Sequence, residues 1–244
     1  EAVASSATEK QSGHLGPGGS EGYELFDRIN VEDTAREAAR IAVTMLGAKP
    51  CPAGKIPVVI DNGFGGVIFH EACGHGLEAT AVARNASVFA GRLGQQIASP
   101  LVTALDDGTI PNGWGSAEMD DEGTPTAKNI LIENGILRSY LVDRLNSRRM
   151  HTAITGSSRR QDYRFAPTSR MTNTFIANGK STPEEIIANT EFGLYAKQMG
   201  GGSVDPATGS FNFAVLEGYM IRNGRIAEPV IAVCMRLLFR RSNR

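Results

Sequence analysis

The chain has 244 residues, of which 41% are hydrophobic and 21% are charged, and its formal net charge at pH 7 is -1. This composition is typical of a folded globular domain, and the balanced charge gives no sign of a nucleic-acid-binding surface. No apolar run of the sequence approaches the roughly twenty residues that a membrane-spanning helix needs. We therefore expect neither a nucleic acid nor a membrane as partner.

The chain opens with a lead-in and a helix. Residues 1–21 are rich in serine, glycine and other small residues, so we expect a flexible lead-in there. Asn30 has the side chain of an N-cap, Asp33 would lie in the first helical turn, and Gly47 would end the helix. The small apolar residues between them predict a packing helix.

A second helix is expected behind a buried layer. Residues 57–60 are rich in β-branched side chains and predict a strand, and residues 65–69 are a small, apolar approach to the sequence His-Glu-Ala-Cys-Gly-His that begins at His70. The helix that carries this motif is predicted to run from about Phe69 to about Arg84.

Most of the remaining chain alternates like β-strands. The expected strands are residues 101–105, 129–133, 137–143, 211–216, 218–222 and 225–230. Asn134-Gly135 and Asn223-Gly224 each separate two of them and favour two-residue hairpin turns. A third helix is expected over residues 183–190, with Ser181 or Thr182 as its cap. These elements predict an α+β fold, strand-rich with mixed or antiparallel pairing, in which one helix carries the motif.

His70, Glu71 and His75 are the residue types of a hydrolytic metal site. Two neutral imidazoles can bind zinc, and a neighbouring glutamate can take a proton from water at the ion. The commoner zinc-protease signature spaces its histidines by four residues, whereas these lie five apart, which is roughly 140° around a regular helix. We therefore expect a local distortion such as a π-bulge, for which Gly74 is suited. The alternative is a pair of buried histidines with a structural role.

Several polar or glycine-rich positions are candidates for substrate contacts. They are Arg159, Arg160, Arg170, Asn173, Gly201 and Gly202. The arginines could grip a peptide backbone or a carboxylate through their forked donors, and plain structural pairing is the alternative. The triple glycine at residues 200–202 would let a strand-like substrate approach an edge, unless it is only a flexible turn. The acidic run at residues 120–122 lacks the offsets of a calcium loop, so a hydrogen-bonded turn is favoured there over a cation site.

Longer stretches of the sequence resemble one family. Over roughly residues 20 to 230, the chain is similar to the TldD branch of the TldD/PmbA family. Segments of the kind found in that family occur here in the same order. These segments are residues 70–78, 87–91, 99–103, 106–109, 120–126, 132–135, 170–174, 183–187 and 200–205.

The resemblance implies a zinc metallopeptidase of the HExxxH type that hydrolyses small or unfolded proteins and peptides. His70 and His75 would be zinc ligands, and Glu71 would be the general base. The family also works in pairs, so the resemblance implies a homodimer, or a heterodimer with a TldE/PmbA-like subunit of the same fold that lacks the metal motif.

One departure concerns the third zinc ligand. Members of the family take it from a Cys-Gly segment near the end of the C-terminal domain, and no such segment follows Val230. Cys234 falls too early to be carried over. We expect residues 22–244 to be a TldD/PmbA-like metallopeptidase domain without the N-terminal domain and with a truncated or altered C-terminal end. The alternative function is a non-catalytic partner subunit or an inactive fragment of the same family.

The cysteines bear on the compartment. Cys51, Cys73 and Cys234 are odd in number and widely spaced, and they include no C-x-x-C pair. This pattern argues against a disulfide scaffold and for free thiols in a reducing compartment. We therefore expect a cytoplasmic protein.

Overall fold

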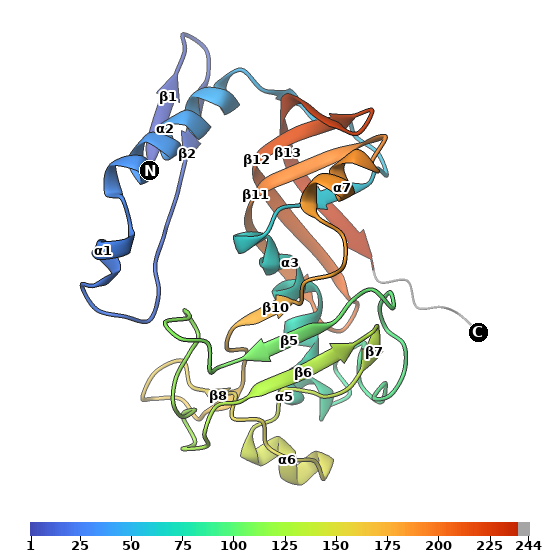
Figure 1. Cartoon of the computed structure of the whole chain (residues 1–244). Coiled ribbons are helices and arrows are strands. Elements are labelled where there is room, and N and C mark those ends of the chain that lie inside the picture. The colour runs from blue at the N-terminus through green and yellow to red at the C-terminus, as the bar shows by residue number, and fades with distance from the viewer. Residues whose placement is uncertain (239–244) are drawn as a thin grey trace. The chain divides into compact units, whose positions relative to one another are not determined.

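The computed structural model describes the backbone of residues 1–238 and the side chains of residues 1–231 (Figure 1). The chain divides into two units, the first comprising residues 1–65, 180–201 and 213–235, and the second residues 66–179 and 202–212. Helices occur with antiparallel and mixed sheets, so the predicted α+β class is confirmed. Within the described residues, no helix has both the length and the apolar character to cross a bilayer.

In the first unit, helix α2 (Val31–Leu46) begins and ends where the sequence predicts. The Asn30 side chain accepts hydrogen bonds from the backbone amides of Glu32 and Asp33, which satisfies two donors at the helix start. Gly47 follows the last helical residue. The buried face of the helix consists of Ala38, Ile41, Ala42 and Met45.

Two shorter helices belong to the same unit. Helix α1 (Leu25–Arg28) precedes α2, and helix α7 (Pro183–Ala188) begins with a capping box. In this box the Thr182 hydroxyl accepts from the Glu185 amide, while the Glu185 carboxylate accepts from the Thr182 amide. Of the two caps that the sequence offers, the structure therefore uses Thr182, and the helix ends before the predicted residue 190.

A β-hairpin corrects the expectation of a flexible lead-in for part of residues 1–21. Strand β1 (Ala2–Ser5) pairs antiparallel with β2 (Lys10–Gly13), and both lie beside α2 (Figure 1). The approach is close at Gly13, where an added Cβ would lie 2.0 Å from the Ala38 carbonyl oxygen. The sequence does not signal this hairpin because its connection at residues 6–9 lacks an Asn-Gly or Asp-Gly pair.

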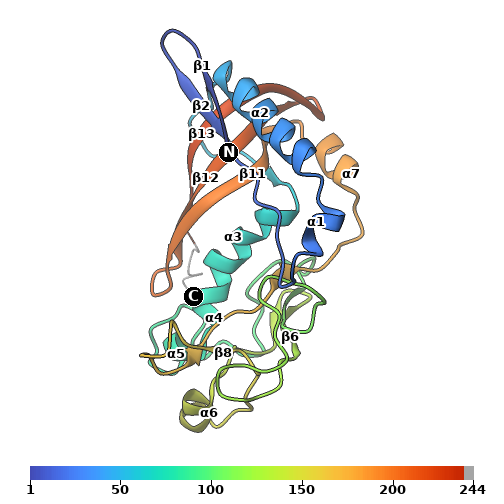
Figure 2. The same ribbon diagram turned by 90° about the vertical axis from the view of Figure 1, so that its left-hand side faces the viewer.

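The first unit contains most of a mixed five-stranded sheet in the order β3-β13-β12-β11-β4, whose three long strands β11, β12 and β13 are labelled in Figure 2. Its strands are β3 (Lys49–Pro50), β4 (Val58–Ile60), β11 (Phe192–Asp205), β12 (Ser210–Arg222) and β13 (Arg225–Leu238). β4 pairs parallel with β11, and β3 pairs parallel with β13. The predicted Asn223-Gly224 turn connects β12 to β13 with φ values of 51° and 71°. One continuous strand, β12, replaces the two strands that the sequence predicts over residues 211–222.

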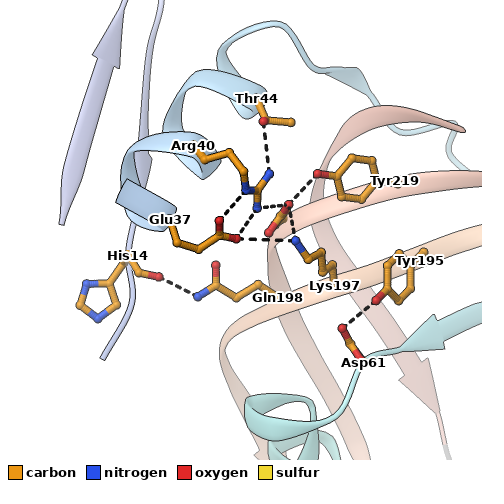
Figure 3. A network of polar contacts seen from close by, with 10 residues as sticks. His14, Glu37, Arg40, Thr44, Asp61, Tyr195, Lys197, Gln198 and Tyr219 are labelled. Carbon is orange, nitrogen blue, oxygen red and sulfur yellow. Dashed lines mark hydrogen bonds and ion pairs between the residues drawn. The ribbon is translucent and has the colours of Figure 1, made fainter. Parts of the chain in front are cut away.

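A polar network holds α2 against this sheet (Figure 3). Glu217 of β12 is only 1% exposed, and its Oε1 accepts hydrogen bonds from Arg40 of α2, Lys197 of β11 and Tyr219. Arg40 also donates to Glu37 on its own helix. A buried carboxylate is tolerated when it is paired and hydrogen-bonded, so these contacts account for a charged residue inside a strand.

The second unit contains an antiparallel four-stranded sheet in the order β10-β5-β6-β7. Its strands are β5 (Ala104–Asp107), β6 (Lys128–Glu133), β7 (Ile136–Leu137) and β10 (Thr174–Ile176), and a separate pair consists of β8 (Ser158–Arg159) and β9 (Thr168–Ser169). The predicted Asn134-Gly135 hairpin joins β6 to β7. The strand expected over residues 137–143 stops after Leu137, and Asp143 instead caps helix α6 (Arg144–Met150).

The motif segment is a series of short helical pieces and not the single helix predicted over residues 69–84. Its pieces are α3 (Val67–Phe69), a π-helical turn (His70–Gly74), α4 (His75–Leu77) and α5 (Ala79–Val82). Glu78 interrupts the series with a ψ of 125°, because the amide of Ala79 donates to the carbonyl of Leu141. The pieces pack on a core that contains Phe69, Leu77, Val82, Phe89, Leu131, Leu137, Leu141 and Met171.

Candidate metal centre

The π-helical turn brings His70 and His75 together. The amide of His75 donates to the carbonyl of His70, five residues earlier, so one extra residue is accommodated in that turn. The two imidazole centroids lie 4.8 Å apart with an interplanar angle of 88°. The predicted distortion of the motif helix is therefore present, and it converts an i,i+5 spacing into neighbouring side chains.

Glu71 joins the two histidines in a set of possible metal donors. One donor atom from each of His70, Glu71 and His75 lies within 4.8 Å of the other two. Two nitrogen ligands of a tetrahedral zinc ion lie roughly 3.4 Å apart, because each Zn–N bond is about 2.1 Å long. The two histidine nitrogens, which lie within 4.8 Å of each other, would need only small side-chain rotations to reach this separation, and Glu71 would then lie beside the ion. The two imidazoles and their spacing therefore fit zinc.

Two glutamates flank His75 and orient its ring. The Nδ1 of His75 lies 3.1 Å from Oε1 of Glu78, and the Nε2 lies 3.9 Å from Oε2 of Glu71. A proton on Nδ1 can be donated to Glu78, which leaves the lone pair of Nε2 on the side of Glu71. A ligating histidine commonly has its other nitrogen held by a carboxylate in this way.

His70 is held neutral. Burial lowers the pKa of His70 to about 4, and the neighbouring His75, Arg170 and Arg159 act in the same direction. A neutral imidazole offers the lone pair that a metal ion needs. His70 is therefore available as a ligand at neutral pH without first losing a proton.

Glycines permit the close packing of the motif turn. A Cβ added at Gly74 would lie 2.1 Å from the Met171 sulfur, and one added at Gly76 would lie 2.8 Å from the ring of Phe89. The hydroxyl of Ser87 donates to the carbonyl of Gly76 and so secures the following turn. The sequence predicts that Gly74 permits the distorted turn. Its lack of a side chain also leaves room for Met171 in the core.

A cavity of about 520 Å³ opens beside the metal-donor set. It lies within the second unit, between residues 71–86 on one side and residues 202–206 on the other. Glu71 and His75 are both on its wall, whereas the cavity lining does not include His70. The proposed base and one histidine therefore face a space that can admit a ligand.

The six candidate substrate contacts have different surroundings. Arg170 lies 3.4 Å from Glu78, and Arg160 donates to the Asp121 carbonyl, so both are engaged. The Asn173 amide accepts from Gly115 and donates to the Asp107 carbonyl and the Ser116 hydroxyl, which leaves it no free group. Arg159 has no side-chain hydrogen bond or ion pair within the described residues, but its charge acts on His70. Gly202 lines the cavity, and Gly201 lies beside it in β11.

The acidic run at residues 120–122 is a hydrogen-bonded turn, as the sequence favours. The Asp120 carboxylate accepts from the amides of Glu122, Thr124 and Ser158. Asp121 and Glu122 accept from the amides of Arg160 and Arg144. These contacts occupy the carboxylates with the backbone of the second unit.

No described thiol completes the metal-donor set. Cys73 does not belong to the donor set, and burial raises the pKa of its thiol to about 12. Cys51 is a free thiol in the first unit. The Cys234 side chain lies outside the described residues, so its distance from the site is not defined.

Sequence reasoning missed Glu78. Its spacing of three residues from His75 is the available signal, because side chains three residues apart in a helix lie on the same face. The partner of Glu78 is Arg170, which lies 92 residues further along the chain. That pairing depends on the tertiary fold and cannot be predicted from local spacing.

Comparison with known proteins identifies the family of the chain. The family model of the PmbA/TldA metallopeptidase C-terminal domain matches residues 53–236. A metalloprotease TldD homolog of Buchnera aphidicola is 43% identical over 229 residues, which is 91% of this chain and 47% of that protein. A zinc metalloprotease TldD homolog of Saccharolobus solfataricus is 30% identical over 210 residues, with 86% and 46% covered. The chain thus spans about half the length of the curated relatives it matches.

A solved structure shares the fold. TldE from Thermococcus kodakarensis superposes with a TM-score of 0.77 at 22% identity, over 97% of this chain and 52% of that chain. At this identity the likeness concerns the fold alone.

Proposed function

Because the chain belongs to the PmbA/TldA metallopeptidase family, we propose that it carries the active centre of a zinc-dependent peptidase, with His70 and His75 as ligands and Glu71 as general base. The observation that carries this proposal is the π-helical turn, which gathers two imidazoles and a carboxylate and puts Glu71 and His75 on the wall of a cavity. The Saccharolobus relative is named a zinc metalloprotease, which supports zinc as the metal.

The chain's own residues supply ligands, orientation and proton transfer. His70 and His75 would hold the ion, and Glu78 fixes the His75 ring with its Nε2 free. When bound, zinc supplies a Lewis acid that brings the pKa of water toward neutrality and polarises a peptide carbonyl. The Glu71 carboxylate accepts the proton of the attacking water and afterwards delivers it to the leaving amine.

The substrate class we propose is an extended peptide or a small unfolded protein. β11 pairs with β4 only over Leu194–Ala196, so within the described strands the later part of that edge, including Gly202, has no partner strand. An unpaired edge beside a cavity suits a peptide that adds as a strand, since main-chain hydrogen bonds do not depend on sequence. Gly201 and Gly202 would let the substrate backbone approach closely.

A second candidate function is a non-catalytic subunit or an inactive fragment of the same family. It is favoured by the absence of a third protein ligand other than Glu71 among the described side chains. A partner subunit of the same fold could form a dimer with this chain, as the likeness to TldE suggests. The free thiols and odd cysteine count support our assignment to a reducing compartment such as the cytoplasm.

Zinc analysis with two variants tests the proposal. We expect the wild-type chain to bind zinc, His75→Ala to lose most of it, and Glu71→Gln to retain zinc while hydrolysing an unfolded protein at least about 100-fold more slowly, since proton transfer contributes that much. Zinc binding without hydrolysis in the wild type would support the non-catalytic alternative. Equal zinc contents in the wild type and His75→Ala would exclude the assigned ligand.

A further inference from the structure

Arg84 lies on the wall of the cavity that also contains the proposed base. The side chain follows α5 and is exposed, and the cavity lining includes it together with Glu71 and His75. Gly202, Ser203, Val204 and Pro206 also line it. A ligand that fills this space would therefore contact the guanidinium together with Glu71 and His75.

The other polar side chains of the lining already have partners. His75 and Glu78 contact each other, and Glu78 also pairs with Arg170. The Thr80 hydroxyl hydrogen-bonds with that of Thr168, and the Ser203 hydroxyl accepts from Asn212. Glu71, the proposed base, lies 3.9 Å from His75.

Arg84, by contrast, has no side-chain hydrogen bond or ion pair within the part of the chain that the structure describes. Asp205, the acidic residue within the opposite segment, is occupied by the Thr208 hydroxyl and the Ala207 amide. At Arg84 the cavity wall thus carries a positive charge that forms no ion pair with a described carboxylate. Arginine is suited to bind a carboxylate through two parallel hydrogen bonds.

We propose that Arg84 is a specificity-determining residue that binds a carboxylate of the peptide substrate. The carboxylate is either an acidic side chain or the free C-terminus, since both present the same two oxygens. This inference rests on the proposed function for the nature of the ligand. It adds a preference to a site whose main-chain contacts would otherwise accept any sequence.

Peptide binding to the zinc-loaded Glu71→Gln chain tests the inference without requiring hydrolysis. The probes are a neutral fluorescent hexapeptide, the same peptide with glutamate in place of glutamine at successive positions, and each of these with a free or an amidated C-terminus. We expect peptides with a suitable carboxylate to bind roughly tenfold more tightly than the neutral amide, as a charge-assisted hydrogen bond would give. The effect of amidation distinguishes the C-terminus from a side chain.

Two variants assign the preference to the residue. Arg84→Gln should bring the affinity ratio of carboxylate and neutral peptides close to one, and Arg84→Lys should keep part of it. Arg148→Gln removes the same charge from an exposed position on α6 in the same unit and should keep the wild-type ratio. Equal affinity of the parent for both peptide classes, or an equal loss in Arg148→Gln, would overturn the inference. Failure of the wild type to hydrolyse any peptide would count against the proposed function alone.

Discussion

At the scale of single residues, Glu78 is the side chain that most directly determines the geometry of the donor set. It is 8% exposed and contacts both the ring of His75 and the guanidinium of Arg170. We predict that Glu78→Ala lowers zinc affinity by about 10- to 100-fold, because the His75 ring loses the partner that fixes its orientation and tautomer. Competition with a chromogenic chelator would measure the change.

The conservative variant Glu78→Gln distinguishes an effect on the orientation of the His75 ring from an effect on folding. Glu78→Gln keeps an oxygen that accepts from Nδ1 of His75, so it should bind zinc more tightly than Glu78→Ala. Circular dichroism would show whether both variants keep the wild-type secondary structure. Wild-type zinc affinity in a folded Glu78→Ala chain would rule out a role in positioning His75.

Asp106 gives a pH-dependent prediction. It is fully buried, and burial raises its pKa to about 6 although Thr172 donates to both carboxylate oxygens. The unfolded value is near 3.8. Since the folded state favours the protonated Asp106 carboxyl, the free energy of unfolding decreases as the pH rises from about 4 to above 6.

Asp106→Asn removes the ionisable group but keeps the size of the side chain. We expect this variant to be more stable than the wild type by about 3 kcal/mol at pH 7 and by less than about 1 kcal/mol at pH 4. Urea denaturation of both proteins at several pH values would measure the difference. A constant difference across this range would mean that Asp106 does not titrate there.

The triad of His70, Glu71 and His75 could be predicted from the sequence because its residue types and spacing are local. The pairing of Glu78 with Arg170 behind this triad could not be predicted, because only the tertiary fold brings the two residues together. Asn173 shows a structural role that local reasoning did not predict. A polar side chain near arginines looked suited to substrate, but its amide holds the loop that contains Gly115 and Ser116.

At the scale of elements, the π-helical turn depends on the space beneath Gly74. A Cβ at this position would lie 2.1 Å from the sulfur of Met171, whose side chain is buried. We predict that Gly74→Ala destabilises the chain by about 1–3 kcal/mol through overpacking and weakens zinc binding, because the turn must shift. Thermal denaturation and chelator competition would measure the two effects.

A compensating substitution tests the cause. Met171→Ala removes the side chain that an alanine at position 74 would strike, so the double variant should bind zinc more tightly than Gly74→Ala. Met171→Ala alone supplies the reference for the cavity that it creates. A double variant that is no better than Gly74→Ala would show that the backbone of the turn, and not Met171, requires the glycine.

The elements that the sequence predicts well have local signals at their ends. α2 has its Asn30 cap and Gly47, and both Asn-Gly turns have positive φ values that few other residues adopt. The strand expected over residues 137–143 has suitable composition, but Asp143 caps a helix instead. The β1–β2 hairpin is stabilised against α2 and has no turn signal of its own, so composition alone could not reveal it.

At the scale of the whole molecule, the division into two units determines where a bound metal should act. All of the proposed ligands and their partners Glu78 and Arg170 belong to the second unit, whereas the network around Glu217 belongs to the first. A ligand that binds only the folded state stabilises the part of the protein that must unfold before the ligand is released. Zinc at 100 times its dissociation constant should therefore stabilise the second unit by about 2.7 kcal/mol.

Hydrogen exchange can locate this stabilisation. We expect zinc to slow exchange roughly 100-fold at the amides of α3 to α5, which corresponds to that free energy, and to leave the amides of β12 in residues 213–222 nearly unchanged. His75→Ala should abolish the effect, because it removes a ligand without touching the first unit. Equal slowing in both units would mean that they open together, and the five-stranded sheet would then share in the stability that the metal centre provides.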